Sequence, residues 1–245
     1  MRALYLKEIR SFLSSIIGYI FILIYLIASG LFHWIITSNT NLNLLEGAEA
    51  DMVPFFYLSP FIFLILIPAI TMRSIAEERR TGTIELLFTR PISDLKILLA
   101  KYFAGVTLLI IAIIPTIIYY ISMYFLGNPV GIIDGGATFT SYIGLILFGA
   151  TFVAIGIFAS SITNSQIVAF ILGMFLCWVF YQGLDLMGSF TQMGSFDSVF
   201  QYCGMTYHYD SIKRGVIDSS DVLYFLSIIT LFMYAALTVI KTLKK

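Results

Sequence analysis

The stretch YIGLILFGATFVAIGIFASS, residues 142–161, runs for 20 residues without one Asp, Glu, Lys or Arg. A helix of that length spans the hydrocarbon core of a bilayer, which is roughly 30 Å thick. Backbone polar groups inside lipid must bond within their own segment, so a helix is the expected form. The sequence therefore predicts an all-α membrane protein with six transmembrane helices in a single domain, residues 1–245. The other five predicted spans are residues 16–36, 53–72, 102–126, 166–187 and 222–240.

The composition of the chain excludes several classes of protein. Of its 245 residues, 59% are hydrophobic and 11% are charged, whereas a soluble domain has roughly 45–50% and 25%. A typical soluble enzyme, a disordered chain and a basic nucleic-acid binder are therefore excluded. The sequence lacks the pattern G-x-x-x-x-G-K-[ST], so it has no P-loop with which to hydrolyse ATP.

Charged residues are absent from the middle of every predicted span. Ion-coupled carriers and enzymes that work inside the membrane need ionisable groups at that depth. We therefore expect no catalytic residues, no metal and no cofactor in this chain.

Basic residues are distributed unevenly between the two sides of the membrane. Twelve of the 14 Lys and Arg residues lie before span one, between spans two and three, or after span six. Only Lys213 and Arg214 lie in the other connections, and the remaining charged residues of those connections are acidic. Because positively charged loops stay on the cytoplasmic side, both termini are predicted to face the cytoplasm.

Residues 3–13, before span one, have apolar side chains at helical spacing. This pattern predicts an amphipathic helix that lies in the membrane surface. A solvated helix at the N-terminus is the alternative.

The connection between spans two and three, residues 73–101, combines charged and apolar residues. We expect Gly82 to end a helix, Thr83 to cap a short helix over residues 84–88, and Pro91 to break the chain again. The short helix carries more apolar residues than an exposed loop tolerates. We therefore expect it to bind in a groove on a soluble partner. A position against lipid headgroups is the alternative, but anionic headgroups attract unbroken clusters of basic residues, and here the charges are mixed.

Small residues lie on one face of span four, at Gly149, Gly156 and Ser160. Small side chains let helices approach closely in lipid. Packing within the chain is the favoured interpretation, and an interface with a second subunit is the alternative.

The outer segment, residues 188–221, is expected to pack on the spans because it holds many apolar residues. Within it, Cys203, Met205 and His208 are residue types that bind copper. The four-ligand spacing of a metal site is absent, so a chance cluster is the favoured interpretation.

The stretch MRSIAEERRTGTIELLFTRPISDLKILLAKYFAG, residues 72–105, resembles the cytoplasmic signature of ABC-2 type (type V exporter-like) transporter permeases. The chain is most similar to the gliding-motility-associated ABC permease subunit of Bacteroidetes. The resemblance implies a multi-pass protein of the bacterial cytoplasmic (inner) membrane that works in export, gliding or another envelope function. It also implies a separate ABC ATPase subunit, a second permease subunit and a larger auxiliary membrane protein, but no nucleic acid.

The same resemblance implies a coupling helix between spans two and three, a connecting helix at the N-terminus and short outer helices between spans five and six. It places ATPase docking on nine residues of the coupling loop, which are Glu77, Glu78, Arg79, Thr81, Gly82, Thr83, Glu85, Leu86 and Leu87. A copper-maturation-type permease, a membrane anchor without transport and a stand-alone channel are the alternatives.

Overall fold

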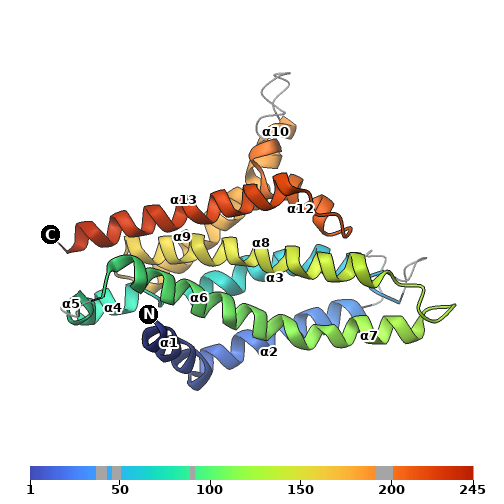
Figure 1. Ribbon diagram of the computed structural model, residues 1–245, viewed down its shortest axis with the longest axis horizontal. Helices are drawn as coiled ribbons and strands as arrows, with labels where there is room; N and C mark the ends of the chain where they lie inside the picture. Colours follow the sequence, from blue (N-terminus) through green and yellow to red (C-terminus); the bar gives the residue numbers. More distant parts are fainter. Residues whose placement is uncertain (37–42, 46–50, 89–91, 191–200, 245) are drawn as a thin grey trace.

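The computed structural model describes residues 1–36, 43–45, 51–88, 92–190 and 201–244. In these residues every regular element is helical, and six helical segments are long and apolar enough to cross a membrane. Figure 1 shows these segments running side by side as a bundle. The α-helices are α1 (Arg2–Ser14), α2 (Ile16–Gly30), α3 (Val53–Thr71), α4 (Ala76–Arg80), α5 (Thr83–Phe88), α6 (Asp94–Ile113), α7 (Ile117–Leu126), α8 (Gly135–Ile162), α9 (Gln166–Trp178), α10 (Leu184–Phe190), α12 (Met205–Ile212) and α13 (Ser219–Leu243). Short π or 3-10 turns continue three of them, η1 (Leu31–Ile35), η2 (Ile114–Thr116) and η3 (Val179–Gly183).

The six predicted spans are confirmed, but several of their helices begin earlier than the apolar stretches do. The helix of span four begins at Gly135 rather than Tyr142, and that of span six begins at Ser219 rather than Val222. The Asp134 carboxylate accepts hydrogen bonds from two N–H groups in the first turn of α8, which caps the helix. Polar first turns can lie outside the hydrocarbon, so apolarity alone underestimates helix length.

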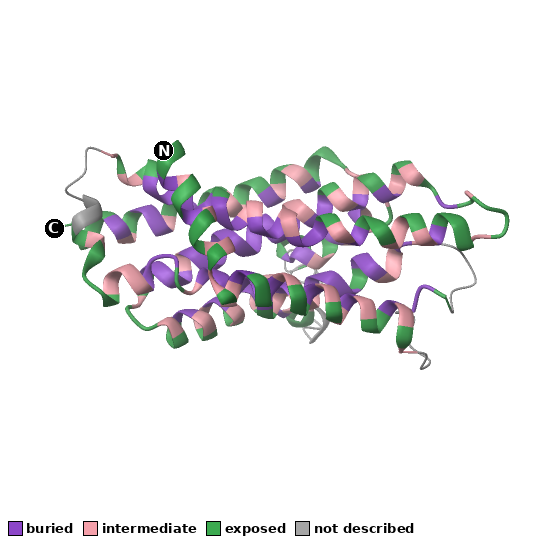
Figure 2. Ribbon diagram, turned by 90° about the horizontal axis from the view of Figure 1, so that it is seen from below, coloured by how far each residue is buried: buried purple, intermediate pink, exposed green. Residues whose placement is uncertain are grey.

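The central helix of the bundle is α8. In its most apolar window 78% of the residues are buried, compared with 28% in the spans of α2, α9 and α13. It packs against α3, α6, α9 and α13. Figure 2 shows buried residues along the middle of the bundle and exposed residues on its outer faces. Many exposed side chains of the outer spans are apolar, such as Ile16 and Ile167, as a surface against lipid requires.

The small residues of α8 allow neighbouring side chains to approach its backbone. A Cβ at Gly149 would lie 2.5 Å from a methyl group of Leu109, and one at Gly156 would lie 2.1 Å from the Thr71 hydroxyl. Leu109 belongs to α6 and Thr71 to α3, so these glycines pack within the chain. This confirms the favoured interpretation of the small-residue face.

Prolines shape two spans in different ways. Pro60 lies inside α3 and has no N–H for the carbonyl of Phe56. The Tyr209 hydroxyl donates to that carbonyl at 2.9 Å, which compensates for the missing helix bond. Burial raises the pKa of Tyr209 well above its ordinary value. Pro115 instead lies in the 3-10 turn η2 that separates α6 from α7.

The short helices that do not cross the bundle lie at its two ends. The end that carries both chain termini, called here the terminal end, also holds α1, α4 and α5 (Figure 1). The opposite end, called the distal end, holds α12, which precedes α13. The helix expected at the N-terminus and the short helix between spans two and three are present, and α12 is one helix between spans five and six. Residues 191–200 of the outer segment lie outside the described residues.

Candidate functional site

The coupling segment, residues 73–101, folds into two short helices and then enters α6. Gly82 lies between α4 and α5 with a φ of +71°, a left-handed conformation that glycine adopts without steric cost. Gly82 therefore ends a helix, as predicted. Thr83 is the first residue of α5 rather than its cap, and its hydroxyl bonds with that of Thr81 at 2.9 Å.

Hydrogen bonds from α8 hold the start of α4. The Ser160 hydroxyl accepts from the backbone N–H groups of Ile75 and Ala76, each at 3.0 Å, and donates to the carbonyl of Met72 at 3.0 Å. These N–H groups belong to the unpaired first turn of a helix, which normally needs a capping partner. Ser160 supplies that partner from another helix, so α4 is tied to the centre of the bundle.

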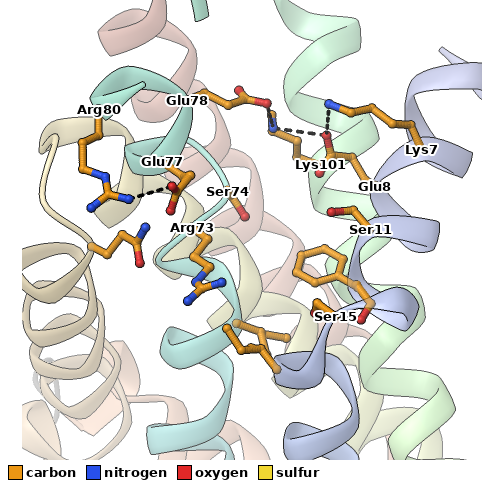
Figure 3. Close-up of a pocket in the computed structure, with 14 residues that line it drawn as sticks. Lys7, Glu8, Ser11, Ser15, Arg73, Ser74, Glu77, Glu78, Arg80 and Lys101 are labelled. Atoms are coloured by element: carbon orange, nitrogen blue, oxygen red, sulfur yellow. Dashed lines mark hydrogen bonds and ion pairs between the residues drawn. The ribbon is translucent and has the colours of Figure 1, made fainter. Parts of the chain in front are cut away.

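Lys101 joins three helices through carboxylates at the terminal end. Its side chain is only 3% exposed, and its Nζ lies 2.8 Å from Glu78 Oε1 and 3.4 Å from Glu8 Oε1. Figure 3 shows Lys101 between these two carboxylates. A buried ammonium group needs such partners because it has left water. Lys101 on α6 thus connects α1 to α4.

Sequence reasoning did not find this pairing, because Glu8 and Lys101 are 93 positions apart. One signal was available in the amphipathic helix α1. Leu4 and Glu8 are its buried residues, and they are four positions apart, so they share one face. An acid on the apolar face of a helix requires a partner.

The nine predicted docking residues fall into groups with different surroundings. Glu78 and Arg79 turn toward the bundle, since Arg79 Nη1 donates to the carbonyl of Ser161 at 2.6 Å. Glu77 pairs with Arg80 at 2.8 Å. Four further residues are exposed, namely Thr81, Gly82, Thr83 and Glu85. The side chains of Leu86 and Leu87 lie outside the described residues.

The distal end contains a second buried polar cluster, between α12 and α13. His208 Nδ1 lies 2.8 Å from Asp221 Oδ1, and His208 Nε2 lies 3.0 Å from the carbonyl of Tyr202. The Ser211 hydroxyl donates to Asp221 Oδ2 at 2.7 Å. Both ring nitrogens of His208 therefore already bond within the chain, and Met205 is fully buried. Among the described residues no group of three or more His, Cys, Asp or Glu is arranged to hold a metal ion.

Comparison with known proteins identifies the family of the chain. None of the curated protein sequences compared with it gives a significant match. The family model described as "ABC-2 family transporter protein" matches residues 3–244, which is nearly the whole chain. The chain therefore belongs to the ABC-2 transporter family, and its six apolar helices make it a membrane-spanning permease subunit of that family.

Proposed function

We propose that the whole chain, residues 1–245, is one transmembrane domain that a separate ABC ATPase subunit drives through the coupling segment. The observation that carries this proposal is the attachment of that segment. Its inner part bonds to α8 through Ser160 and to α6 through Lys101. Its outer part, from Thr81 to Glu85, includes exposed residues at the terminal end. A segment with this arrangement can receive a push on one side and pass it to the spans on the other.

The nine predicted docking residues take two roles in this proposal. The exposed residues Thr81, Gly82, Thr83 and Glu85, together with Leu86 and Leu87, form the surface that meets the ATPase. Glu77, Glu78 and Arg79 position that surface, because two of them bond to the bundle and the third pairs with Arg80. The positioning residues therefore act on docking indirectly.

The mechanism that follows is a change between two arrangements of the helices. ATP binding brings two ATPase subunits together, and their movement displaces α5 and α4. Ser160 passes this displacement to α8, which packs against four other spans. Lys101 passes it to α6 and α1. Packed helices respond to such a displacement by switching between discrete arrangements.

The proposed setting is the bacterial cytoplasmic membrane, with the terminal end on the cytoplasmic side. Twelve of the 14 basic residues lie before span one, between spans two and three, or after span six in the sequence, and ten of these are described residues at or near that end. This distribution supports the orientation. We further propose that the chain pairs with a second permease subunit, identical or not, and works in export. The resemblance to gliding-motility permeases supports a role in gliding or another envelope function, with a larger auxiliary membrane protein as a further partner.

The proposal is tested by affinity purification of the tagged chain from native membranes, with mass spectrometry of the proteins that accompany it. The test variant combines Thr83→Arg with Glu85→Lys, two exposed positions of the coupling segment. The control variant, Thr242→Lys, adds a positive charge at an exposed position near the end of α13. Thermal unfolding of all three proteins verifies that they are equally folded.

We expect an ABC ATPase to accompany the parent and the control, but not the test variant. An ATPase retained by all three would place docking outside the coupling segment. Absence of any ATPase, under conditions that keep known transporter complexes intact, would contradict the permease proposal. A membrane anchor without transport would then be the better explanation.

A further inference from the structure

A cavity lies at the terminal end between α1 and the coupling segment. Its volume is about 560 Å³, which is within the range of ligand-binding sites. Charged residues of α1, α4 and α6 line it, together with the apolar side chains of Phe12, Ile17 and Ile70. Ile17 and Ile70 belong to two of the spans. The cavity therefore combines charged groups with apolar side chains from two of the candidate spans.

Within the described part of the chain, Arg73 is the cation of this cavity that has no ion-pair or hydrogen-bond partner. Among the described residues no ion pair or hydrogen bond reaches its guanidinium group, and Figure 3 shows it apart from the bonded charges. Every other charged residue of the cavity has an opposite charge nearby. These pairs are Lys101 with Glu8 and Glu78, Lys7 with Glu8, and Arg80 with Glu77.

Three carboxylates also line the cavity, and they would repel an anion if they were not neutralised. Glu8 and Glu78 both lie within 3.4 Å of Lys101, and Glu77 lies 2.8 Å from Arg80. With four cations and three carboxylates in its lining, the cavity has an excess of one positive charge. That excess is at Arg73, so an anionic ligand would bind there.

The chemistry of the lining identifies the kind of anion. A guanidinium group offers a planar set of donors that matches the oxygens of a phosphate. Ser11, Ser74 and Gln166 line the same cavity and can add neutral donors. The apolar wall at Ile17 and Ile70 suits the first carbons of an acyl chain, which a soluble anion lacks. We propose that this cavity binds the phosphate headgroup of an anionic phospholipid, with Arg73 as its anchor.

This site goes beyond the transport function proposed above and does not depend on the ATPase. It is tested on the purified chain alone, in an uncharged detergent. The probes are dihexanoyl phosphatidylglycerol, dihexanoyl phosphatidylcholine and inorganic phosphate. Each probe is titrated while the Tm is recorded, because a ligand that binds only the folded state raises the Tm by an amount that grows with the logarithm of its concentration divided by its Kd.

The test variant is Arg73→Gln, and Arg73→Lys keeps the charge but loses the planar group. The matched control is Arg10→Gln, which removes an exposed arginine of α1 that does not line the cavity. We expect saturable stabilisation of the parent by phosphatidylglycerol, with a Kd about tenfold higher in Arg73→Gln, as for loss of one charged hydrogen bond. Arg73→Lys should fall between them, and Arg10→Gln should match the parent.

Several results would overturn the proposal. Equal Kd values in the parent and both Arg73 variants would show that the lipid binds elsewhere, and the absence of saturable stabilisation would show that there is no site. If phosphatidylcholine bound as tightly as phosphatidylglycerol, the net negative charge of the lipid would not contribute to binding, and the site would not be specific for anionic lipids. If inorganic phosphate bound equally well with the same dependence on Arg73, the site would belong to a soluble anion rather than to a lipid.

Discussion

The terminal and distal ends both hold short helices against the same central helix by hydrogen bonds, but only the contact of α12 adds close packing on a glycine of that helix. At the terminal end, α4 depends on hydrogen bonds to Ser160 and on the ionic contact between Glu78 and Lys101. At the distal end, the Ser141 hydroxyl of α8 donates to the carbonyl of Ile212 at 2.9 Å. There α12 also packs so closely that a Cβ at Gly144 would lie 1.7 Å from a methyl group of Ile212. Polar bonds can break and re-form after a small displacement, whereas close packing resists deformation. The comparison fits a terminal end that moves and a distal end that stays fixed.

The largest effect is expected from Lys101→Met, which removes the cation that joins α1, α4 and α6. Glu78, which is only 18% exposed, would lose its cation, and Glu8, which is 12% exposed, would keep only the exposed Lys7 at 3.6 Å. Breaking a buried ion pair in this way lowers the free energy of unfolding by about 3 kcal/mol. Denaturant unfolding in detergent measures the loss.

The control for this prediction neutralises all three groups at once. The variant Lys101→Met, Glu8→Gln, Glu78→Gln leaves no buried charge unpaired, so it should recover most of the lost stability. If the triple variant were as unstable as Lys101→Met alone, side-chain packing rather than charge would explain the effect.

The next effect is expected from Ser160→Ala, which removes the side-chain cap of α4. Two backbone N–H groups and the carbonyl of Met72 would lose their partner, at a cost of about 2 kcal/mol. Hydrogen exchange should rise in residues 72–80 and stay unchanged in residues 205–212. Equal increases in hydrogen exchange at the terminal and distal ends would contradict the distinction between a terminal end that moves and a distal end that stays fixed.

A smaller effect is expected from Gly144→Ala at the distal end. The added methyl group would overlap Ile212, and such overpacking costs about 1.5 kcal/mol. The double variant Gly144→Ala, Ile212→Val should not relieve the overlap, because valine keeps the Cγ2 methyl group that causes it. The double variant Gly144→Ala, Ile212→Ala removes this methyl group and should relieve the overlap in part. Thermal unfolding distinguishes the three variants, and an unchanged Tm in Gly144→Ala would mean that α12 is not tightly packed.

The smallest effect is expected from Tyr209→Phe, which removes one buried hydrogen bond. The carbonyl of Phe56, left free by Pro60, would lose its donor, which costs about 1 kcal/mol. The matched control is Tyr207→Phe on the same helix, because Tyr207 is exposed. A decrease in stability of the same size in both variants would argue against the role given to Tyr209.

The spans could be predicted from the sequence because lipid demands about 20 consecutive apolar residues in each. Gly82 could be predicted as a helix end because few residues adopt its left-handed conformation. The contacts that hold the coupling segment in place could not be predicted, because Ser160 and Glu8 lie far from it along the chain. For the same reason, Glu78 and Arg79 were expected to face the partner but turn toward the bundle.

The most direct test of the central claim is ATP hydrolysis by the proposed ABC ATPase partner, reconstituted with the chain in lipid vesicles. The parent should stimulate hydrolysis over the ATPase alone. Ser160→Ala should reduce this stimulation by about fivefold or more, as expected for the loss of a coupling free energy of 1–3 kcal/mol, while Tyr209→Phe should retain it. Equal stimulation by the parent and Ser160→Ala, with the complex intact in both, would contradict the transmission of movement through α4 to α8.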